Sequence, residues 1–222
     1  MSVKSLIISF ALTIFPTLAN SSNTLVVGVD ASNSAPVLES SFAQKSGQYV
    51  ADIIIDMPLG DIVQLQTFGE FSTSDTRVSE TFRLSRKSRP QAIALGVGNF
   101  IASVPEKIAS GELRAQQQTA LFAWLGNMAR AHPCATEETH FLLVSDGLTY
   151  ESIANAYTLI KSTGNTFPPA KTGLFEGCKL TIIGLGRGGD GLNAVLVDRL
   201  RSMWEVWAAD AGFIQVKLYN DW

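Results

Sequence analysis

Two stretches of the chain decide its fold: LVVGVDASNS at residues 25–34 and FLLVSDG at residues 141–147. Each begins with a continuous apolar run and passes directly into polar residues. A short apolar run bounded by turn residues is typical of a strand that is buried on both faces of a parallel sheet. The two stretches therefore predict buried strands at Leu25–Val29 and Phe141–Val144, with oxygen-bearing side chains at their carboxyl ends.

Outward from these stretches, strand-length apolar runs alternate with apolar residues at helical spacing. Strands are predicted at Leu25–Val29, Ile62–Phe68, Thr81–Leu84, Phe141–Val144, Leu180–Leu185 and Phe213–Leu218. Helices are predicted at Val37–Ile55, Thr119–Ala131, Tyr150–Lys161 and Leu192–Trp207, with a further one between Pro90 and Gln118 beside the polar strand ends. This alternation predicts an α/β fold: a doubly wound, mostly parallel sheet with one antiparallel edge strand, Thr81–Leu84, and helices on both faces.

Composition sets the class of protein. Of the 222 residues, 46% are hydrophobic and 17% are charged, which suits one globular domain with a substantial core. The formal net charge is −3. Because there is no overall excess of positive charge, we expect no nucleic-acid partner.

The first 19 residues have the features of a signal peptide. Lys4 precedes the apolar run Ser5–Ala19, and Thr17-Leu18-Ala19 has the small residues that a cleavage site requires. The run is too short for a membrane-spanning helix, and Pro16 interrupts it. We therefore expect a signal peptide at 1–19, a single domain at 20–222, no membrane span after cleavage, and a periplasmic or secreted location.

Export also bears on the two cysteines, Cys134 and Cys178. Cys134 comes shortly before the strand Phe141–Val144, and Cys178 comes directly before the strand Leu180–Leu185. If these strands are parallel neighbours, both cysteines lie at the same end of the sheet, and an oxidising compartment favours a disulfide between them. The alternative is two buried, reduced cysteines.

The polar strand ends form a candidate ligand site, because α/β sheets bind ligands at the carboxyl ends of their strands. Asp30, Ser32 and Ser34 follow the first strand, and Ser145-Asp146-Gly147 follows the fourth. Hard divalent cations take oxygen ligands, and neutral hydroxyl groups leave such a cation with charge for an external ligand. The alternative is a purely structural role, since Ser and Thr cap helices and Asp forms Asx-turns in the same loops.

This pattern resembles the von Willebrand factor A-like (vWA) domain, whose metal-ion-dependent adhesion site combines Asp-x-Ser-x-Ser, a distant Thr and a later Asp-Gly. The matching positions are Asp30, Ser32, Ser34, Thr119 and Asp146, which Gly147 follows. The resemblance extends from Leu25 to Leu218 and implies a Rossmann-like fold and a site for Mg²⁺, or for Mn²⁺ or Ca²⁺. It also implies a protein partner that completes the site with an Asp or Glu side chain. The chain departs from the family at its end, because it has no helix after the last predicted strand.

We therefore expect an exported domain that binds proteins in a metal-dependent manner and is not an enzyme. One alternative is a structural subunit of an envelope or secretion assembly with an incidental metal, and a less favoured one is a metal-assisted hydrolase. We expect Asp30 to lie on a surface turn, so that Asp30→Ala would leave the fold largely intact.

Four further features have structural interpretations. The glycine-rich segment Gly184–Gly189 follows a strand as in dinucleotide-binding proteins, but it comes too late in the chain, so we expect a tight strand-to-helix loop and no NAD. His132, His140 and the cysteines lack the spacing of a zinc site. The other two features are a basic cluster and a set of tryptophans. The basic cluster comprises Arg83, Arg86, Lys87 and Arg89, and we expect it to protect an edge strand, or else to dock an acidic partner. The tryptophans are Trp204, Trp207 and Trp222, and we expect them to pack in the core, or else to face another chain.

Overall fold

The computed structural model describes residues 22–70, 78–162, 166–188 and 192–222. The predicted signal peptide at 1–19 lies outside the described residues, as does Gly189. A six-stranded sheet has the order β3-β2-β1-β4-β7-β8, and a two-stranded hairpin, β5-β6, stands apart from it. The strands of the sheet are β1 (Thr24–Asp30), β2 (Ile62–Phe68), β3 (Ser79–Arg83), β4 (Thr139–Val144), β7 (Lys179–Ile183) and β8 (Gln215–Tyr219).

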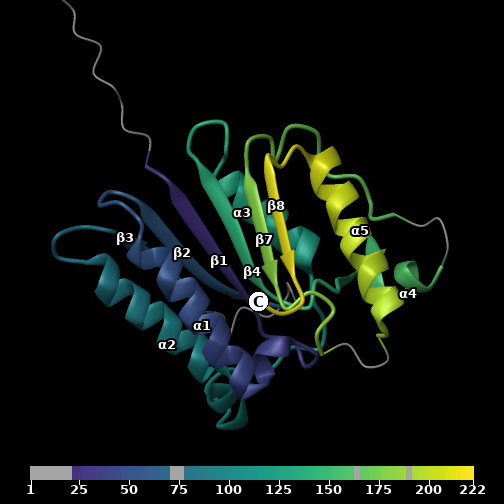
Figure 1. The fold of residues 1–222 in the computed structure, drawn as a ribbon, viewed down its shortest axis with the longest axis horizontal. Coiled ribbons are helices and arrows are strands. Elements are labelled where there is room, and N and C mark those ends of the chain that lie inside the picture. The colour runs from purple at the N-terminus through teal and green to yellow at the C-terminus, as the bar shows by residue number, and fades with distance from the viewer. Residues whose placement is uncertain (1–21, 71–77, 163–165, 189–191) are drawn as a thin grey trace, which may run out of the picture.

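All neighbouring strands are parallel except β2 and β3, which are antiparallel. The predicted α/β fold with one antiparallel edge strand is therefore confirmed. β1 is buried at every position and pairs with β2 on one side and β4 on the other. Consequently the polar residues after β1 and β4 meet at the carboxyl ends of these strands, near the label C in Figure 1.

Helices cover both faces of the sheet (Figure 1). A single 3₁₀ turn at Pro36–Leu38 precedes α1 (Ser40–Ile55), which lies on one face together with α2 (Pro90–Ala109). On the other face lie α3 (Leu121–Ala131), α4 (Ala156–Lys161) and α5 (Ala194–Ala211). The helix expected between Pro90 and Gln118 is thus α2, and the segment that follows it leads to the strand ends.

The predicted helix at Tyr150–Lys161 is wrong in its first half. Residues Tyr150–Glu151 (β5) and Ala154–Asn155 (β6) pair as a small antiparallel hairpin, and only Ala156–Lys161 is helical. Asn155 caps this short helix by accepting a hydrogen bond from Thr158 N at 3.1 Å. The helix therefore begins where its cap lies and not at the first apolar residue.

α2 is long and apolar enough by length and composition to cross a membrane, and it is one such helix among the described residues. In the fold it packs against α1, where the two backbones approach closely at Gly47 and Gly98. A Cβ atom on Gly47 would lie 2.4 Å from the carbonyl oxygen of Gly98, so no larger residue fits there. The buried side of α2 carries Ala94, Val97 and Ile101, as in a helix of a domain core.

Trp204 and Trp207 pack in the interior, as predicted, whereas Trp222 is only partly buried. Trp204 is fully buried and its Nε1 donates a hydrogen bond to the carbonyl of Gly147 at 2.9 Å. Trp207 lies beside it with ring centroids 5.3 Å apart. Trp222 lies on the opposite face, where its ring contacts Phe42 and Tyr49 of α1.

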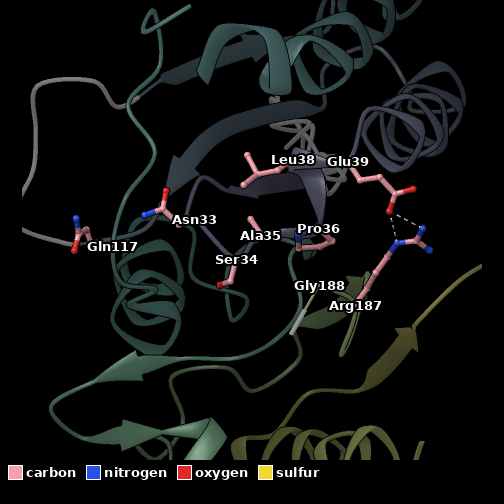
Figure 2. A pocket seen from close by; sticks show the side chains of 9 residues that line it. All are labelled: Asn33, Ser34, Ala35, Pro36, Leu38, Glu39, Gln117, Arg187 and Gly188. Carbon is pink, nitrogen blue, oxygen red and sulfur yellow. Dashed lines mark hydrogen bonds and ion pairs between the residues drawn. The ribbon is translucent and has the colours of Figure 1, made fainter. Parts of the chain in front are cut away.

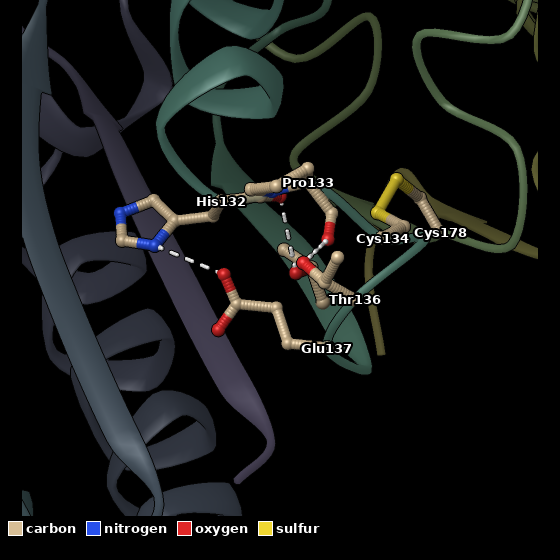
Figure 3. The surroundings of a disulfide bond; sticks show 7 residues. His132, Pro133, Cys134, Thr136, Glu137 and Cys178 are labelled. Atoms are coloured by element: carbon tan, nitrogen blue, oxygen red, sulfur yellow. Dashed lines mark hydrogen bonds and ion pairs between the residues drawn. A yellow bond between two sulfur atoms is a disulfide. The ribbon is translucent and has the colours of Figure 1, made fainter. Parts of the chain in front are cut away.

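A disulfide joins Cys134 and Cys178, as predicted (Figure 3). Cys134 precedes β4 and Cys178 precedes β7, and these strands are parallel neighbours in register, with His140 opposite Lys179. The bond therefore lies at the end of the sheet opposite the polar strand ends. Beside it, Thr136 Oγ1 donates a hydrogen bond to the carbonyl of Pro133 at 3.1 Å.

Candidate functional site

Asp30 ends β1 and is fully buried, so the expectation that it lies on a surface turn is wrong. Its Oδ1 accepts a hydrogen bond from Ser32 N at 2.9 Å, and its Oδ2 accepts one from Ser145 Oγ at 2.9 Å. The first bond is an Asx-type turn that bends the chain directly after the strand. The second bond joins the ends of β1 and β4. Asp30 therefore holds two strand ends together, and its replacement by alanine would remove both bonds.

The turn after Asp30 places its two serines at different depths. Ser32 is 2% exposed, whereas Ser34 is exposed, and their Oγ atoms are 3.5 Å apart. The segment after α2 runs alongside this turn, because Gln116 N donates to Ala31 O at 2.8 Å and Asn33 N donates to Gln116 O at 2.9 Å. This backbone pairing brings the segment that contains Thr119 to the serines.

Thr119 lies two residues before α3 and is 3% exposed. Its carbonyl accepts hydrogen bonds from Tyr150 N at 2.8 Å and from Thr149 Oγ1 at 3.0 Å. The next residue, Ala120, donates its N–H to Gly69 O at the end of β2. The threonine expected to open a helix is therefore outside the helix, fixed between β2 and the β5-β6 hairpin.

Asp146 follows β4 and is fully buried. Its Oδ1 accepts a hydrogen bond from Leu148 N at 2.8 Å, while its Oδ2 is buried with no hydrogen-bond partner among the described residues. Gly147 has φ of 72°, and a Cβ atom there would lie 2.6 Å from Leu185. A glycine is thus required directly after Asp146, because both the backbone conformation and the space exclude a larger residue.

Burial dominates the electrostatics of the two acids. It raises the pKa of Asp30 from 3.8 to about 6, although hydrogen bonds from Ser32 and Ser145 oppose the change. The pKa of Asp146 is raised well above 3.8, first by burial and then by the negative charge of Asp30. The two carboxyl groups therefore titrate as a pair and are costly to ionise together.

The predicted metal ligands fit a divalent cation in their chemistry. They comprise two carboxylates and three hydroxyl groups, all of which are the oxygen ligands that hard cations prefer. A cation beside Asp146 Oδ2 would give that buried atom its missing partner and would lower the pKa of both acids. Among the described residues, no three His, Cys, Asp or Glu side chains gather as a metal cluster, so any metal here depends on the hydroxyl groups.

The site opens into two pockets on either side of Ser34 and Gln117. The larger, of about 480 Å³, runs from Gln117 past Ser34 to Arg187, which forms an ion pair with Glu39 at 2.9 Å (Figure 2). The smaller, of about 300 Å³, contains Thr119. Its lining residues are Ser34, Gln117, Gln118, Thr119, Leu148, Thr149, Tyr150, Asn155 and Tyr157.

The glycine-rich segment after β7 is a tight loop that lies against the turns carrying Asp146 and Ser34. Gly184, Gly186 and Gly188 all have positive φ, and Gly186 N donates to the carbonyl of Asp146 at 2.7 Å. A Cβ atom on Gly188 would lie 2.9 Å from the carbonyl oxygen of Ser34. The glycines therefore allow the loop to approach both polar turns closely.

Sequence reasoning missed two residues of the site. The first is Ser145, whose Oγ donates a hydrogen bond to Asp30 Oδ2 and accepts one from Gly147 N. Glu151 accepts hydrogen bonds from Phe122 N at 2.7 Å and Ala123 N at 3.3 Å, and so caps the start of α3. An acidic residue 29 positions from the helix that it caps leaves no local signal in the sequence.

The histidines do not contribute to the candidate site. His140 lies near the start of β4, where its Nε2 is 2.9 Å from Thr181 Oγ1 and burial lowers its pKa to about 4. His132 lies 3.7 Å from Glu137, beside the disulfide (Figure 3). Both are remote from the polar strand ends.

No protein-family model and no curated protein matches this chain. Its fold is similar to that of the pilus adhesin SpaC from Lactobacillus rhamnosus GG, with a TM-score of 0.51 and 12% identity over 92% of this chain and 29% of that one. It is also similar to the conserved hypothetical protein BatB from Bacteroides thetaiotaomicron (TM-score 0.47, 14% identity, 90% and 91% covered). A further similar structure is the von Willebrand factor type A protein from Catenulispora acidiphila (TM-score 0.43, 17% identity, 90% and 39% covered).

The strand order, the antiparallel edge strand and the helices on both faces are those of the Rossmann-like fold that the vWA resemblance implies. The chain spans 39% of the length of the Catenulispora protein and 29% of that of SpaC. The likeness to SpaC establishes the fold alone.

Proposed function

We propose that this chain binds another protein through a divalent cation held at the polar ends of β1 and β4. One observation carries the proposal: Asp146 Oδ2 is fully buried without a hydrogen-bond partner among the described residues, next to a second buried acid. A buried acceptor without a donor destabilises a fold, and two adjacent carboxylates destabilise it further. A bound cation would remove both penalties.

The proposed ligands divide into two groups. Both oxygens of Asp30 already accept hydrogen bonds, so this residue would hold the ion through water or with its remaining lone pairs. Asp146 Oδ2 is available for direct contact. The hydroxyl groups are those of Ser32, Ser34 and Thr119. When bound, the ion would supply positive charge and an open coordination position for a carboxylate from outside the chain.

The exposure of the ligands supports an external partner. Ser34 is exposed and lines both pockets, whereas the two acids are sealed in the interior. An incoming side chain would therefore reach the site from the side of the hydroxyl groups. An Asp or Glu side chain suits this position, because it matches the charge that neutral ligands leave uncompensated. The fold of this chain is similar to that of SpaC, which is named a pilus adhesin, and this agrees with a binding role.

We further propose that the chain is exported after removal of residues 1–19 and that it binds without chemical turnover. Mg²⁺ is the proposed native ion, with Mn²⁺ or Ca²⁺ as substitutes, since all three take oxygen ligands.

The test is metal binding followed by partner capture. Mn²⁺ binding is measured by the loss of the electron paramagnetic resonance signal of free Mn²⁺, for the wild-type protein and for Asp146→Asn. We expect weak binding by the wild type and none by the variant. Asp210→Asn is the control, because Asp210 lies exposed on α5. Circular dichroism establishes that all three proteins are folded.

The immobilised protein is then exposed to an envelope extract of its source cell, with Mg²⁺ or with a chelator. Capture of a partner in Mg²⁺ only, lost in Asp146→Asn and kept in Asp210→Asn, supports adhesion through the metal. Capture that is unchanged in chelator and in Asp146→Asn rejects it and supports a structural subunit instead.

A further inference from the structure

Large apolar side chains are exposed on and directly after the β5-β6 hairpin. The exposed fractions are 54% for Tyr150, 62% for Ile153 and 39% for Tyr157. Single exposed apolar residues are ordinary on protein surfaces, but three within eight positions form a local patch. Two of them, Tyr150 and Tyr157, also form a wall of the 300 Å³ pocket. The patch therefore adjoins a pocket, which single exposed apolar residues do not form.

The hairpin is rigidly connected to the candidate metal site. The N–H of Tyr150 donates to the carbonyl of Thr119 at 2.8 Å, and Thr149 Oγ1 donates to the same carbonyl at 3.0 Å. Glu151 then anchors the hairpin to the first turn of α3. These bonds hold the hairpin beside Thr119, which lines the same pocket as Tyr150 and Tyr157.

The chemistry of this pocket differs from that of the adjoining site. None of its nine lining side chains carries a formal charge, although Ser34 and Thr119 are shared with the proposed metal ligands. The Lys161 ammonium group lies 3.7 Å from the centroid of the Tyr157 ring and adds positive potential near one wall. The pocket thus suits an uncharged side chain, while the side of the pocket formed by Ser34 and Thr119 suits an acid held by the metal.

We infer that the binding partner presents an acidic residue directly beside a large apolar side chain, preferably an aromatic one, and that the pocket between Thr119, Tyr150 and Tyr157 takes the apolar side chain. The inference rests on the proposed function, because the acid is placed by the metal. Its own basis is that Ser34 and Thr119, two of the proposed hydroxyl ligands, line the same uncharged pocket as Tyr150 and Tyr157. Burial of an aromatic side chain there should strengthen binding about tenfold.

Three blocked tripeptides test the inference: Phe-Asp-Phe, Ala-Asp-Ala and Phe-Asn-Phe. Each is titrated into the ¹⁵N-labelled protein with Mg²⁺ or with chelator, and dissociation constants are obtained from amide chemical shifts. In Mg²⁺ we expect Phe-Asp-Phe to bind about tenfold more tightly than Ala-Asp-Ala, and Phe-Asn-Phe to bind much more weakly than either. Amides of the hairpin should shift with Phe-Asp-Phe only.

Two pocket variants and one control identify the source of this preference. Tyr150→Ser and Tyr157→Ser should reduce the tenfold preference to below about twofold and leave the affinity for Ala-Asp-Ala unchanged. Tyr150→Ser keeps the backbone N–H that binds Thr119. Ile214→Ser is the matched control, because Ile214 is 67% exposed and directly precedes β8, at the opposite end of the sheet.

The outcomes separate the two proposals. If both aspartate peptides bind equally in Mg²⁺ and release in chelator, the pocket inference is rejected and the metal proposal stands. If neither aspartate peptide responds to Mg²⁺, the proposed function fails and this inference fails with it. If Tyr150→Ser and Tyr157→Ser weaken Ala-Asp-Ala as much as Phe-Asp-Phe, the hairpin only supports the metal site and the specificity role is rejected.

Discussion

Asp30 and Asp146 differ from ordinary surface acids, because both are removed from water at adjacent strand ends. Ser145 and the N–H groups of Ser32 and Leu148 satisfy three of their four oxygens, which leaves Asp146 Oδ2 without a donor among the described residues. Hydrogen bonds partly offset the burial of Asp30 but do not restore its usual pKa. The site is therefore electrostatically incomplete, because one buried carboxyl oxygen has no donor among the described residues.

This incompleteness predicts an unusual dependence of stability on pH. Asp30 keeps its proton up to about pH 6 in the folded protein but releases it near pH 3.8 when unfolded. The folded state then binds more protons, so its stability is greatest below about pH 3.8 for this group and falls as the pH rises through 6. The free energy of unfolding of metal-free protein, measured relative to Asp30→Asn by urea denaturation, should fall by about 2 kcal/mol between about pH 4 and pH 7.

Saturating Mg²⁺ should abolish this fall, because a cation stabilises the ionised acids. Asp210→Asn, on the exposed side of α5, should follow the wild type at every pH. A difference between wild type and Asp30→Asn that is constant with pH would show that Asp30 is ionised without penalty. Asp30→Asn is preferred to Asp30→Ala here, because asparagine preserves the size of the buried side chain.

Among the elements, the β5-β6 hairpin differs most from its prediction. Apolar residues between Tyr150 and Lys161 have helical spacing, yet the first six residues, Tyr150–Asn155, form a hairpin and its turn. Thr149 and Glu151 explain the difference, since both bind the N-terminal turn of α3. Hydrogen bonds to a distant helix terminus outweigh a local helical preference, which is worth only tenths of a kcal/mol per residue.

The cap provided by Glu151 can be measured directly. Its carboxylate accepts two backbone N–H groups of α3. Glu151→Ala should therefore lower the free energy of unfolding by about 1–2 kcal/mol in urea denaturation. Glu205→Ala, at an exposed position of α5, should change it by less than about 0.5 kcal/mol. Equal effects of the two substitutions would contradict the capping role.

In the whole molecule, the sheet separates two cores. One lies beneath α1 and α2, and the other beneath α3, α4 and α5. The polar residues lie at the carboxyl ends of the strands, and the disulfide between Cys134 and Cys178 lies at the opposite end of the sheet, where β4 and β7 begin. The bond closes a loop with a sequence separation of 44 residues that contains β4, the hairpin and α4. It therefore restrains the elements that carry Asp146 and the aromatic pocket.

Loss of the disulfide should destabilise the entire domain. The chain-entropy relation gives about 4 kcal/mol for a loop of this length. The double variant Cys134→Ala, Cys178→Ala should show this loss in urea denaturation, with the wild type under reducing conditions as the comparison. Intact mass after alkylation without reduction should detect no free thiol in the native protein. Two readily alkylated thiols would show that the bond is absent.

The alternation of buried strands and amphipathic helices was predictable from the sequence, because apolar periodicity records local burial. The order of the polar strand ends was predictable for the same reason, and so was the proximity of Cys134 to Cys178. The burial of Asp30 was not, since it arises from segments far apart in the chain, such as the one that carries its hydrogen-bond donor Ser145, 115 positions away. Nor were the cap from Glu151 and the aromatic wall beside Thr119. These features arise from contacts between distant segments, and such contacts decide the electrostatics of the site only once the chain has folded.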